Sequence, residues 1–227
     1  LLNDLGPEAI DTIFTKANDP IAVQEQGDRL LLSLAQMLPK DRPTFGVINM
    51  RAAHAPYENG YRQDVSFVPP WPLSREDKLG TSYDNALAYT DGIITSLMRL
   101  QESSFNGNRA FVVTADHGEA LGERGLVGHN ILTPEVASVP ALLRVKWQQG
   151  VAPRLPDIPY LTHAGLHGWI LAQIGGRVVN PSARSDRAFF HGVDFYADNF
   201  YVTVTPDKNG QPQLSEPRLT SDARNIN

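Results

Sequence analysis

The chain has 227 residues, of which 41% are hydrophobic and 20% are charged. This is enough apolar material for one sizeable buried core, and the charges are too few and too mixed in sign for a disordered chain. The formal net charge of −5, with no run of basic residues, argues against a nucleic-acid backbone as the main partner. Because the sequence has no cysteine, disulfides are excluded and metal ligands must come from Asp, Glu and His.

The first half of the chain predicts two helices separated by a strand. Apolar residues at helical spacing predict a helix over 21–38, which Pro39 ends. The segment 44–50 is then expected to form a strand. Residues 82–100 again have helical apolar spacing, and a polar turn at 106–108 follows them. This alternation is typical of the α/β class.

The second half predicts mainly strands. Residues 110–114 are all apolar or β-branched, so we expect a strand that is buried on both faces. The elements expected after it are a strand over 139–145, a helix over 162–174 stopped by Gly175 and Gly176, and a strand over 200–205 before a turn at 207–210. We expect the polar tail, 215–227, to be partly disordered.

An aspartate, a histidine and a glycine, Asp116, His117 and Gly118, follow the predicted strand 110–114 directly. Open α/β sheets place their chemistry at the carboxyl ends of such strands. Oxygen and nitrogen donors side by side suit a divalent metal, and Gly118 lets the backbone turn without a Cβ clash. For the tripeptide alone, a turn with a solvated aspartate is an equally good interpretation, so the surrounding sequence decides.

Three longer motifs surround this tripeptide. Residues 114–130 read TADHGEALGERGLVGHN and precede a Val-Pro strand, residues 48–57 read INMRAAHAPY, and residues 81–91 read TSYDNALAYTD. In order and spacing they resemble the alkaline phosphatase superfamily, in its sulfatase and phosphoethanolamine-transferase branch. The motif at 81–91 is similar to a helix typical of the transferases. The resemblance covers roughly residues 28–175.

The resemblance implies an alkaline phosphatase-like α/β/α sandwich with a mixed, mostly parallel central sheet. We interpret residues 1–227 as a single, partial catalytic domain that lacks the upstream nucleophile segment, because neither Thr12 nor Thr15 matches the family's nucleophile. Members of this branch are usually tethered to the bacterial inner membrane by N-terminal helices, with a periplasmic or extracytoplasmic catalytic domain. The chain itself shows no apolar stretch of membrane-spanning length and does not start with a signal peptide.

The resemblance also implies roles for individual residues. Asp116 and His117 match metal ligands for a divalent ion, with zinc favoured. His54 and His129 match the family's substrate-side histidines, which bind a non-bridging oxygen, protonate the leaving group or ligate a second metal. For these two histidines, the structural alternative is a loop side chain hydrogen-bonded to the backbone.

Other polar residues are better interpreted as structural or surface residues. They are the pairs Glu119 with Glu123, His163 with His167, and Arg51 with Arg62, together with His191. The glutamates have the spacing of a paired-carboxylate site but are more typical of solvent-facing residues or of residues behind a ligand. The paired histidines fall on the family's late packing helix, the arginines suit the surface, and the last histidine suits a strand end near the core.

These observations predict a metal-dependent transferase that moves a phosphoethanolamine-type group from a phospholipid donor to an envelope lipid or glycan. In the family this reaction runs through a covalent phospho-enzyme. A sulfatase, which hydrolyses sulfuric esters, is the alternative among enzymes. A non-catalytic, membrane-tethered sensor or binding domain of the same fold also stays open.

Overall fold

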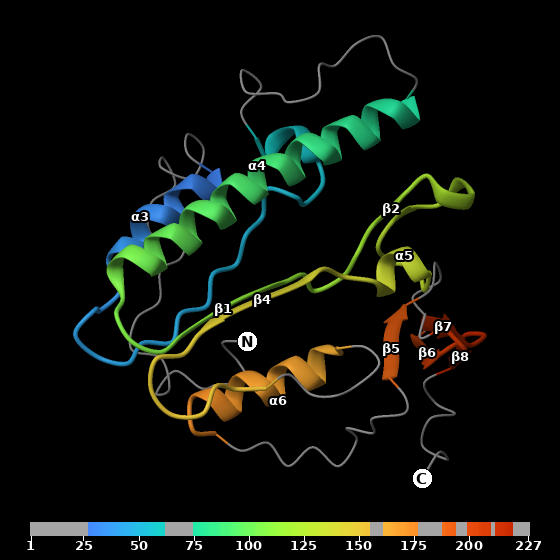
Figure 1. Cartoon of the computed structure of the whole chain (residues 1–227). Coiled ribbons are helices and arrows are strands. Elements are labelled where there is room, and N and C mark those ends of the chain that lie inside the picture. Colours follow the sequence, from blue (N-terminus) through green and yellow to red (C-terminus); the bar gives the residue numbers. More distant parts are fainter. Residues whose placement is uncertain are drawn as a thin grey trace. The chain divides into compact units, whose positions relative to one another are not determined.

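The polypeptide divides into two units, Leu1–Asn106 and Gly107–Asn227 (Figure 1). This computed structural model describes residues 27–61, 75–154, 161–176, 188–193, 199–209 and 212–219. Among these residues, no helix combines the length and the apolar character needed to cross a membrane.

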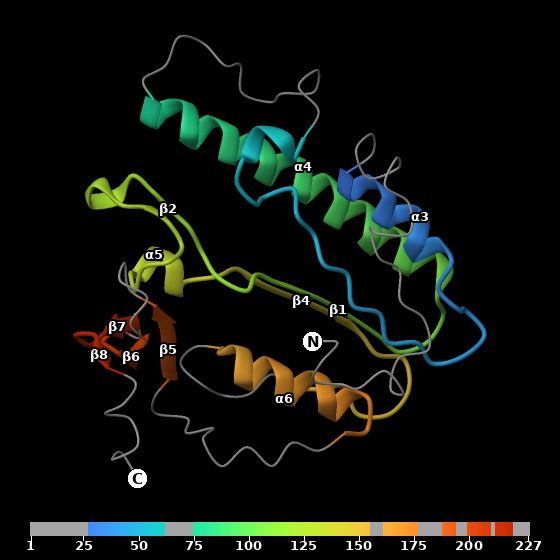
Figure 2. The ribbon, with the colours of Figure 1, turned by 180° about the vertical axis from the view of Figure 1, so that it is seen from behind.

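The first unit is built on a long helix, α4 (Arg75–Ser104), with a short helix, α3 (Leu30–Gln36), lying along it (Figures 1 and 2). The buried side chains of α4 recur at helical spacing, at Ala86, Ile93 and Leu97. The predicted helix 82–100 is therefore confirmed and is longer at both ends. Of the predicted helix 21–38, α3 and the 3-10 turn η3 (Gly27–Arg29) are present, and residues 21–26 lie outside the described part.

The predicted strand over 44–50 was wrong. These residues form no strand, and residues 44–49 are exposed. A strand exists only where its backbone N–H and C=O groups pair with a neighbouring strand, and no such partner is described for this segment. Apolar and β-branched residues create a preference for extended backbone, but they do not supply the partner.

The second unit begins with a two-stranded antiparallel ribbon of β1 (Arg109–Thr114) and β4 (Ala141–Lys146). Both predicted strands are confirmed, although β4 starts two residues later than expected. Residues Arg109 to Val113 are half-buried, so the expectation of burial on both faces was wrong. Among the described strands only β4 pairs with β1, and a two-stranded ribbon cannot enclose its own faces.

Short elements lie between the two strands of this ribbon. They are β2 (Ala120–Leu121), the 3-10 turn η6 (Glu123–Gly125), β3 (Val127–Gly128) and α5 (Pro134–Ala137). The strands β2 and β3 pair as an antiparallel hairpin. These elements carry too few residues for a periodic pattern, so the sequence did not predict them.

The helix α6 (His163–Gln173) confirms the predicted helix over 162–174. Thr162 caps its start, because the threonine Oγ1 accepts a hydrogen bond from a backbone N–H of the first turn. At its other end Gly175 has φ of +79°, and the N–H of Gly176 donates to the Leu171 carbonyl over 2.8 Å. This is a Schellman ending, in which a glycine takes the left-handed conformation.

The last described residues form a four-stranded antiparallel sheet with β6 at its centre. Its strands are β5 (Ala188–Val193), β6 (Asn199–Pro206), β7 (Pro212–Leu214) and β8 (Arg218–Leu219). The predicted strand 200–205 is confirmed within β6. Within the tail 215–227, β8 pairs with β6, and the expectation that the tail is partly disordered stays a prediction. Of the predicted turn 207–210, the structure describes 207–209, where the Asp207 Oδ1 accepts from the N–H of Asn209 over 2.7 Å, and residue 210 lies outside the described part.

Every strand pair in the described part of the chain is antiparallel. The mixture of helices and sheets agrees with the predicted α/β character. The mostly parallel central sheet and the single catalytic domain over 1–227 stay predictions.

Candidate metal centre

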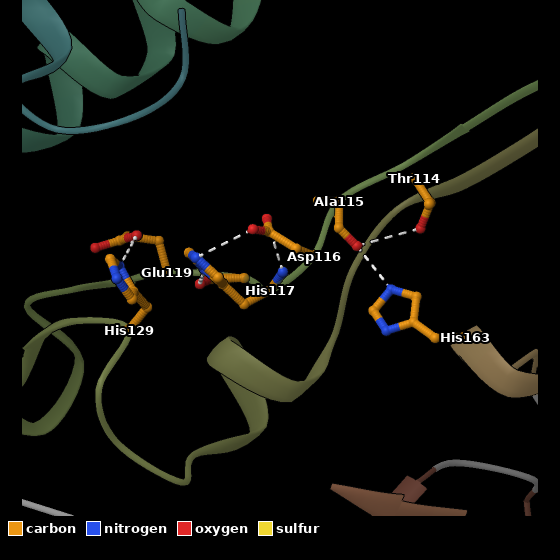
Figure 3. Close-up of polar contacts among 8 residues, drawn as sticks. Thr114, Ala115, Asp116, His117, Glu119, His129 and His163 are labelled. Carbon is orange, nitrogen blue, oxygen red and sulfur yellow. Dashed lines mark hydrogen bonds and ion pairs between the residues drawn. The ribbon is translucent and has the colours of Figure 1, made fainter. Parts of the chain in front are cut away.

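A histidine, a glutamate and a second histidine come together around the β2–β3 hairpin (Figure 3). His117, Glu119 and His129 each offer one ligand atom, and these atoms lie within 4.8 Å of one another. The glutamate side chain is only 12% exposed, whereas each imidazole is about a third exposed. The cluster is thus partly sheltered but open to a ligand from solvent.

The hairpin register explains why Glu119 meets His129. Ala120 pairs with Gly128, so the residues one step outward on each strand face each other. The His129 Nδ1 lies 3.1 Å from the Glu119 Oε2. An ionised carboxylate only accepts hydrogen bonds, so the proton of this contact is on the His129 Nδ1.

The two imidazoles of the cluster stack on each other. The ring centroids of His117 and His129 lie 4.0 Å apart, with an angle of 23° between the planes. The Nδ1–H of His117 donates to the Gly118 carbonyl over 2.9 Å, which leaves its Nε2 free to bind a metal.

Asp116 lies beside the cluster. Its side chain is 89% exposed, its Oδ1 accepts the backbone N–H of His117 over 3.1 Å, and its Oδ2 lies 3.8 Å from the His117 Nε2. Two ligands of one tetrahedral zinc ion, at bond lengths near 2 Å, are separated by about 3.3 Å. Asp116 and His117 therefore fit a shared zinc ion with only a small side-chain movement.

Gly118 holds the turn against α5. Its N–H donates to the Val136 carbonyl over 2.8 Å, and a Cβ at this position would lie only 2.0 Å from the Glu135 carbonyl oxygen. The glycine is needed for this close backbone approach rather than for the turn that the sequence suggested, because its φ is not positive.

An ion pair links the hairpin tip to α5. The Arg124 guanidinium donates to the Glu135 carboxylate over 2.6 Å. The pKa of Glu135 lies below its ordinary value of 4.5, first because its own backbone N–H donates to the carboxylate and second because Arg124 does. Both contacts favour the charged form.

His54 belongs to the other unit. It is exposed, and its Nδ1 donates to the Ala55 carbonyl over 2.6 Å. The loop before it is held by the buried Asp28, whose Oδ2 accepts the N–H groups of Arg51 and Ala52, each over 2.7 Å. The substrate-side role that the resemblance implies for His54 stays a prediction.

Glu119 was expected to face solvent or to lie behind a ligand, and the structure places it in the cluster, hydrogen-bonded to His129. Its pairing with Glu123 was misleading, because the Glu123 Oε2 instead accepts the N–H of Leu121 over 2.7 Å. The sequence does contain a clue to the contact between Glu119 and His129. The two residues are equally far along the chain from the glycine-rich hairpin tip, so they are expected to face each other across the hairpin.

The remaining candidates take varied positions. His163 contacts the Ala115 carbonyl, and His167 is exposed on the same helix. Arg51 is exposed as expected, and Arg62, like Thr12 and Thr15, lies outside the described residues.

His191 was expected at a strand end near the core, but it lies within β5, opposite Tyr201, and is exposed. Alternate residues of a strand face opposite sides, so adjacency to aromatic residues did not bury it.

Comparison with known proteins gives two matches. The family model described as Sulfatase matches residues 10–153, well over half of the chain. The chain is also 40% identical over 115 residues to phosphatidylethanolamine transferase Mcr-1 of Escherichia coli, which covers 45% of this chain and 21% of that protein. The match thus spans about a fifth of the length of this curated relative. No solved structure matches the chain.

The family match includes the strand β1, the Asp-His-Gly turn and the whole hairpin that carries Glu119 and His129. Enzymes of this family have an α/β fold and depend on a divalent metal, and the cluster offers the nitrogen and oxygen donors that such an ion requires. The chain therefore belongs to the sulfatase family of the alkaline phosphatase superfamily, in the branch that includes the phosphoethanolamine transferases.

Proposed function

We propose that this chain carries part of the active site of a zinc-dependent phosphoethanolamine transferase. The observation that carries the proposal is the grouping of Asp116, His117, Glu119 and His129 at one turn and one hairpin. The similarity to phosphatidylethanolamine transferase Mcr-1 favours this reaction over others of the family.

Asp116 and His117 would hold the zinc ion, through a carboxylate oxygen and the Nε2 of the ring. When bound, zinc lowers the pKa of the attacking hydroxyl and polarises a phosphoryl oxygen. The charge of Asp116 favours a cation here, and the hydrogen bond from the His117 Nδ1 to Gly118 fixes the ring orientation.

His129 would act on the transferred group. Glu119 accepts the Nδ1–H of His129 and so orients the ring. In its doubly protonated form, the imidazolium would donate its Nε2–H to a non-bridging phosphoryl oxygen or give that proton to the leaving group. His54 is proposed for the same task. The nucleophile is not assigned in this chain.

The reaction consists of two displacements at phosphorus. An enzyme hydroxyl oxygen bonds to the phosphorus of phosphatidylethanolamine, the bond to the diacylglycerol oxygen breaks, and that oxygen takes up a proton. An oxygen of an envelope lipid or glycan then bonds to phosphorus, and the enzyme oxygen leaves and regains its proton. We propose that this reaction takes place at the periplasmic face of the bacterial inner membrane.

The test uses the full-length protein that contains this chain, with phosphatidylethanolamine vesicles and an aryl sulfate ester assayed in parallel. We expect diacylglycerol release and no sulfate hydrolysis. Asp116→Ala should lose both zinc and turnover, while Asp41→Ala removes an exposed carboxylate of the other unit and should keep both. Hydrolysis of the sulfate ester alone would establish a sulfatase, and a native protein with neither activity nor metal would establish a non-catalytic member.

A further inference from the structure

The carbonyl of Ala115, at the end of β1, is held by a side chain from a distant helix. The His163 Nε2 lies 2.7 Å from this oxygen, although 48 residues separate the two (Figure 3). We propose that His163 is a positioning residue for the metal centre, which it would serve by fixing the backbone entering Asp116 and His117. This inference rests on the proposed function.

The contact has a defined donor. A carbonyl oxygen only accepts, so the proton of the hydrogen bond must be on the Nε2 of His163. The paired register of β1 and β4 ends at Thr114 and Ala141, which leaves the Ala115 carbonyl one residue beyond the ladder. The Thr114 Oγ1 also approaches this oxygen, but at 3.4 Å, so the imidazole makes the stronger contact.

The Asp-His pair is therefore held from both sides. On the far side, the N–H of Gly118 donates to the Val136 carbonyl of α5. On the near side, the Ala115 carbonyl accepts from His163 of α6. The two residues between these hydrogen bonds are Asp116 and His117, the proposed zinc ligands.

The helix that carries His163 is well anchored. Thr162 caps it, Leu166 and Trp169 are buried, and the Trp169 Nε1 donates to the Arg154 carbonyl over 3.0 Å. His163 itself is exposed, so its replacement leaves the buried side chains of the helix in place. Removal of the donor should affect the turn rather than the core.

Residues that orient a metal ligand typically contribute about 10- to 100-fold in metal affinity or turnover. We expect loss of the His163 donor to fall in this range. Because the proposed contact is with the enzyme backbone and not with substrate, kcat should fall while KM changes little.

The experiment compares His163→Gln with His163→Met in the full-length protein. The two replacements have similar length, but only glutamine keeps an N–H donor. His167→Met, four residues further on the same helix and exposed, is the matched control. Affinity for Zn²⁺ is measured by competition with a chromogenic chelator in the absence of substrate, followed by turnover and thermal unfolding.

The inference predicts weak zinc binding in His163→Met, near-native binding in His163→Gln and His167→Met, and unchanged unfolding temperatures. It is overturned if His163→Met binds zinc like the native protein, if both His163 variants are equally weak, or if His163→Met fails to fold. Failure of the proposed function would instead appear in the substrate specificity of the native protein.

Discussion

The two stacked histidines have different neighbours, and this difference predicts different roles. The His117 Nε2 faces the Asp116 carboxylate, whereas the His129 Nδ1 faces Glu119. A nitrogen beside an exposed carboxylate is suited to a shared cation. A ring oriented by a hydrogen-bonded carboxylate on its other nitrogen is suited to binding or proton transfer.

We therefore expect some histidine variants to lose both zinc and turnover, and others to lose turnover alone. His117→Ala should lose zinc and activity together. His129→Ala and His54→Ala should keep zinc while turnover falls by about 10² to 10⁴, the usual effect of losing a positioned proton donor or charge stabiliser. Elemental analysis and initial rates on the same preparations test this. Zinc loss in His129→Ala would make that histidine a ligand, and an unchanged rate would make it structural.

The close approach at Gly118 predicts a cost for adding one methyl group. Gly118→Ala places a Cβ 2.0 Å from the Glu135 carbonyl oxygen, so the turn must move away from α5 and the free energy of unfolding should fall by about 1–3 kcal/mol. Gly168→Ala, within α6, meets no atom within 4 Å and should raise it by about 0.5–1 kcal/mol. Urea unfolding of both variants tests whether the free energy of unfolding changes in these opposite directions. An unchanged free energy of unfolding in Gly118→Ala would show that α5 does not hold the turn.

At the scale of elements, polar contacts connect α5 to the turn and to the hairpin that carry the cluster. The hairpin register brings Glu119 to His129, and α5 receives both the Gly118 N–H and the Arg124 side chain. Neither element buries enough surface to be stable alone, so each depends on these polar contacts.

The lowered pKa of Glu135 predicts a pH-dependent contribution to stability. The folded protein holds this carboxyl below 4.5, so its stabilisation is present above that pH and is lost as pH falls through the lowered folded value. Because the pair is partly exposed, we expect Glu135→Gln to lose only about 0.2–1 kcal/mol at pH 7. Below pH 4.5 the difference in stability between Glu135→Gln and the native protein should become smaller.

Arg124→Gln serves as the comparison. It removes the second cause of the shift but leaves the first, the backbone N–H of Glu135, so its effect at pH 7 should be the smaller of the two. Denaturant titrations over the pH range test both variants. A stability difference for Glu135→Gln that is constant with pH would contradict the role of the carboxylate charge.

At the scale of the whole molecule, the proposed zinc ligands Asp116 and His117 and the neighbouring pair Glu119 and His129 all lie within the second unit. A bound ion stabilises the segment that holds it, by a free energy that grows with the logarithm of its affinity. We expect Zn²⁺ to slow amide hydrogen exchange in 116–129 and to leave α4 of the first unit unchanged. Mass spectrometry of peptides with and without Zn²⁺ measures this. Equal protection of α4 would mean that the first unit also supplies ligands.

The sequence by itself determined the elements that depend on local chemistry. Helical apolar spacing predicted the middle of α4 and all of α6, and a β-branched run predicted β1. Glycines at the end of α6 predicted where the helix stops. The motif at 114–130 also predicted the family, which the comparisons confirmed. These features are encoded within a few residues of one another.

Tertiary structure decided what depends on a distant partner. Residues 44–50 look like a strand but have no described neighbour to pair with, while β8 is ordered within a polar tail because β6 pairs with it. Glu119 joins His129 through the hairpin register, and His163 reaches the Ala115 carbonyl from a helix 48 residues away. Pairing and approach of this kind require the folded backbone, because no local pattern specifies which groups meet.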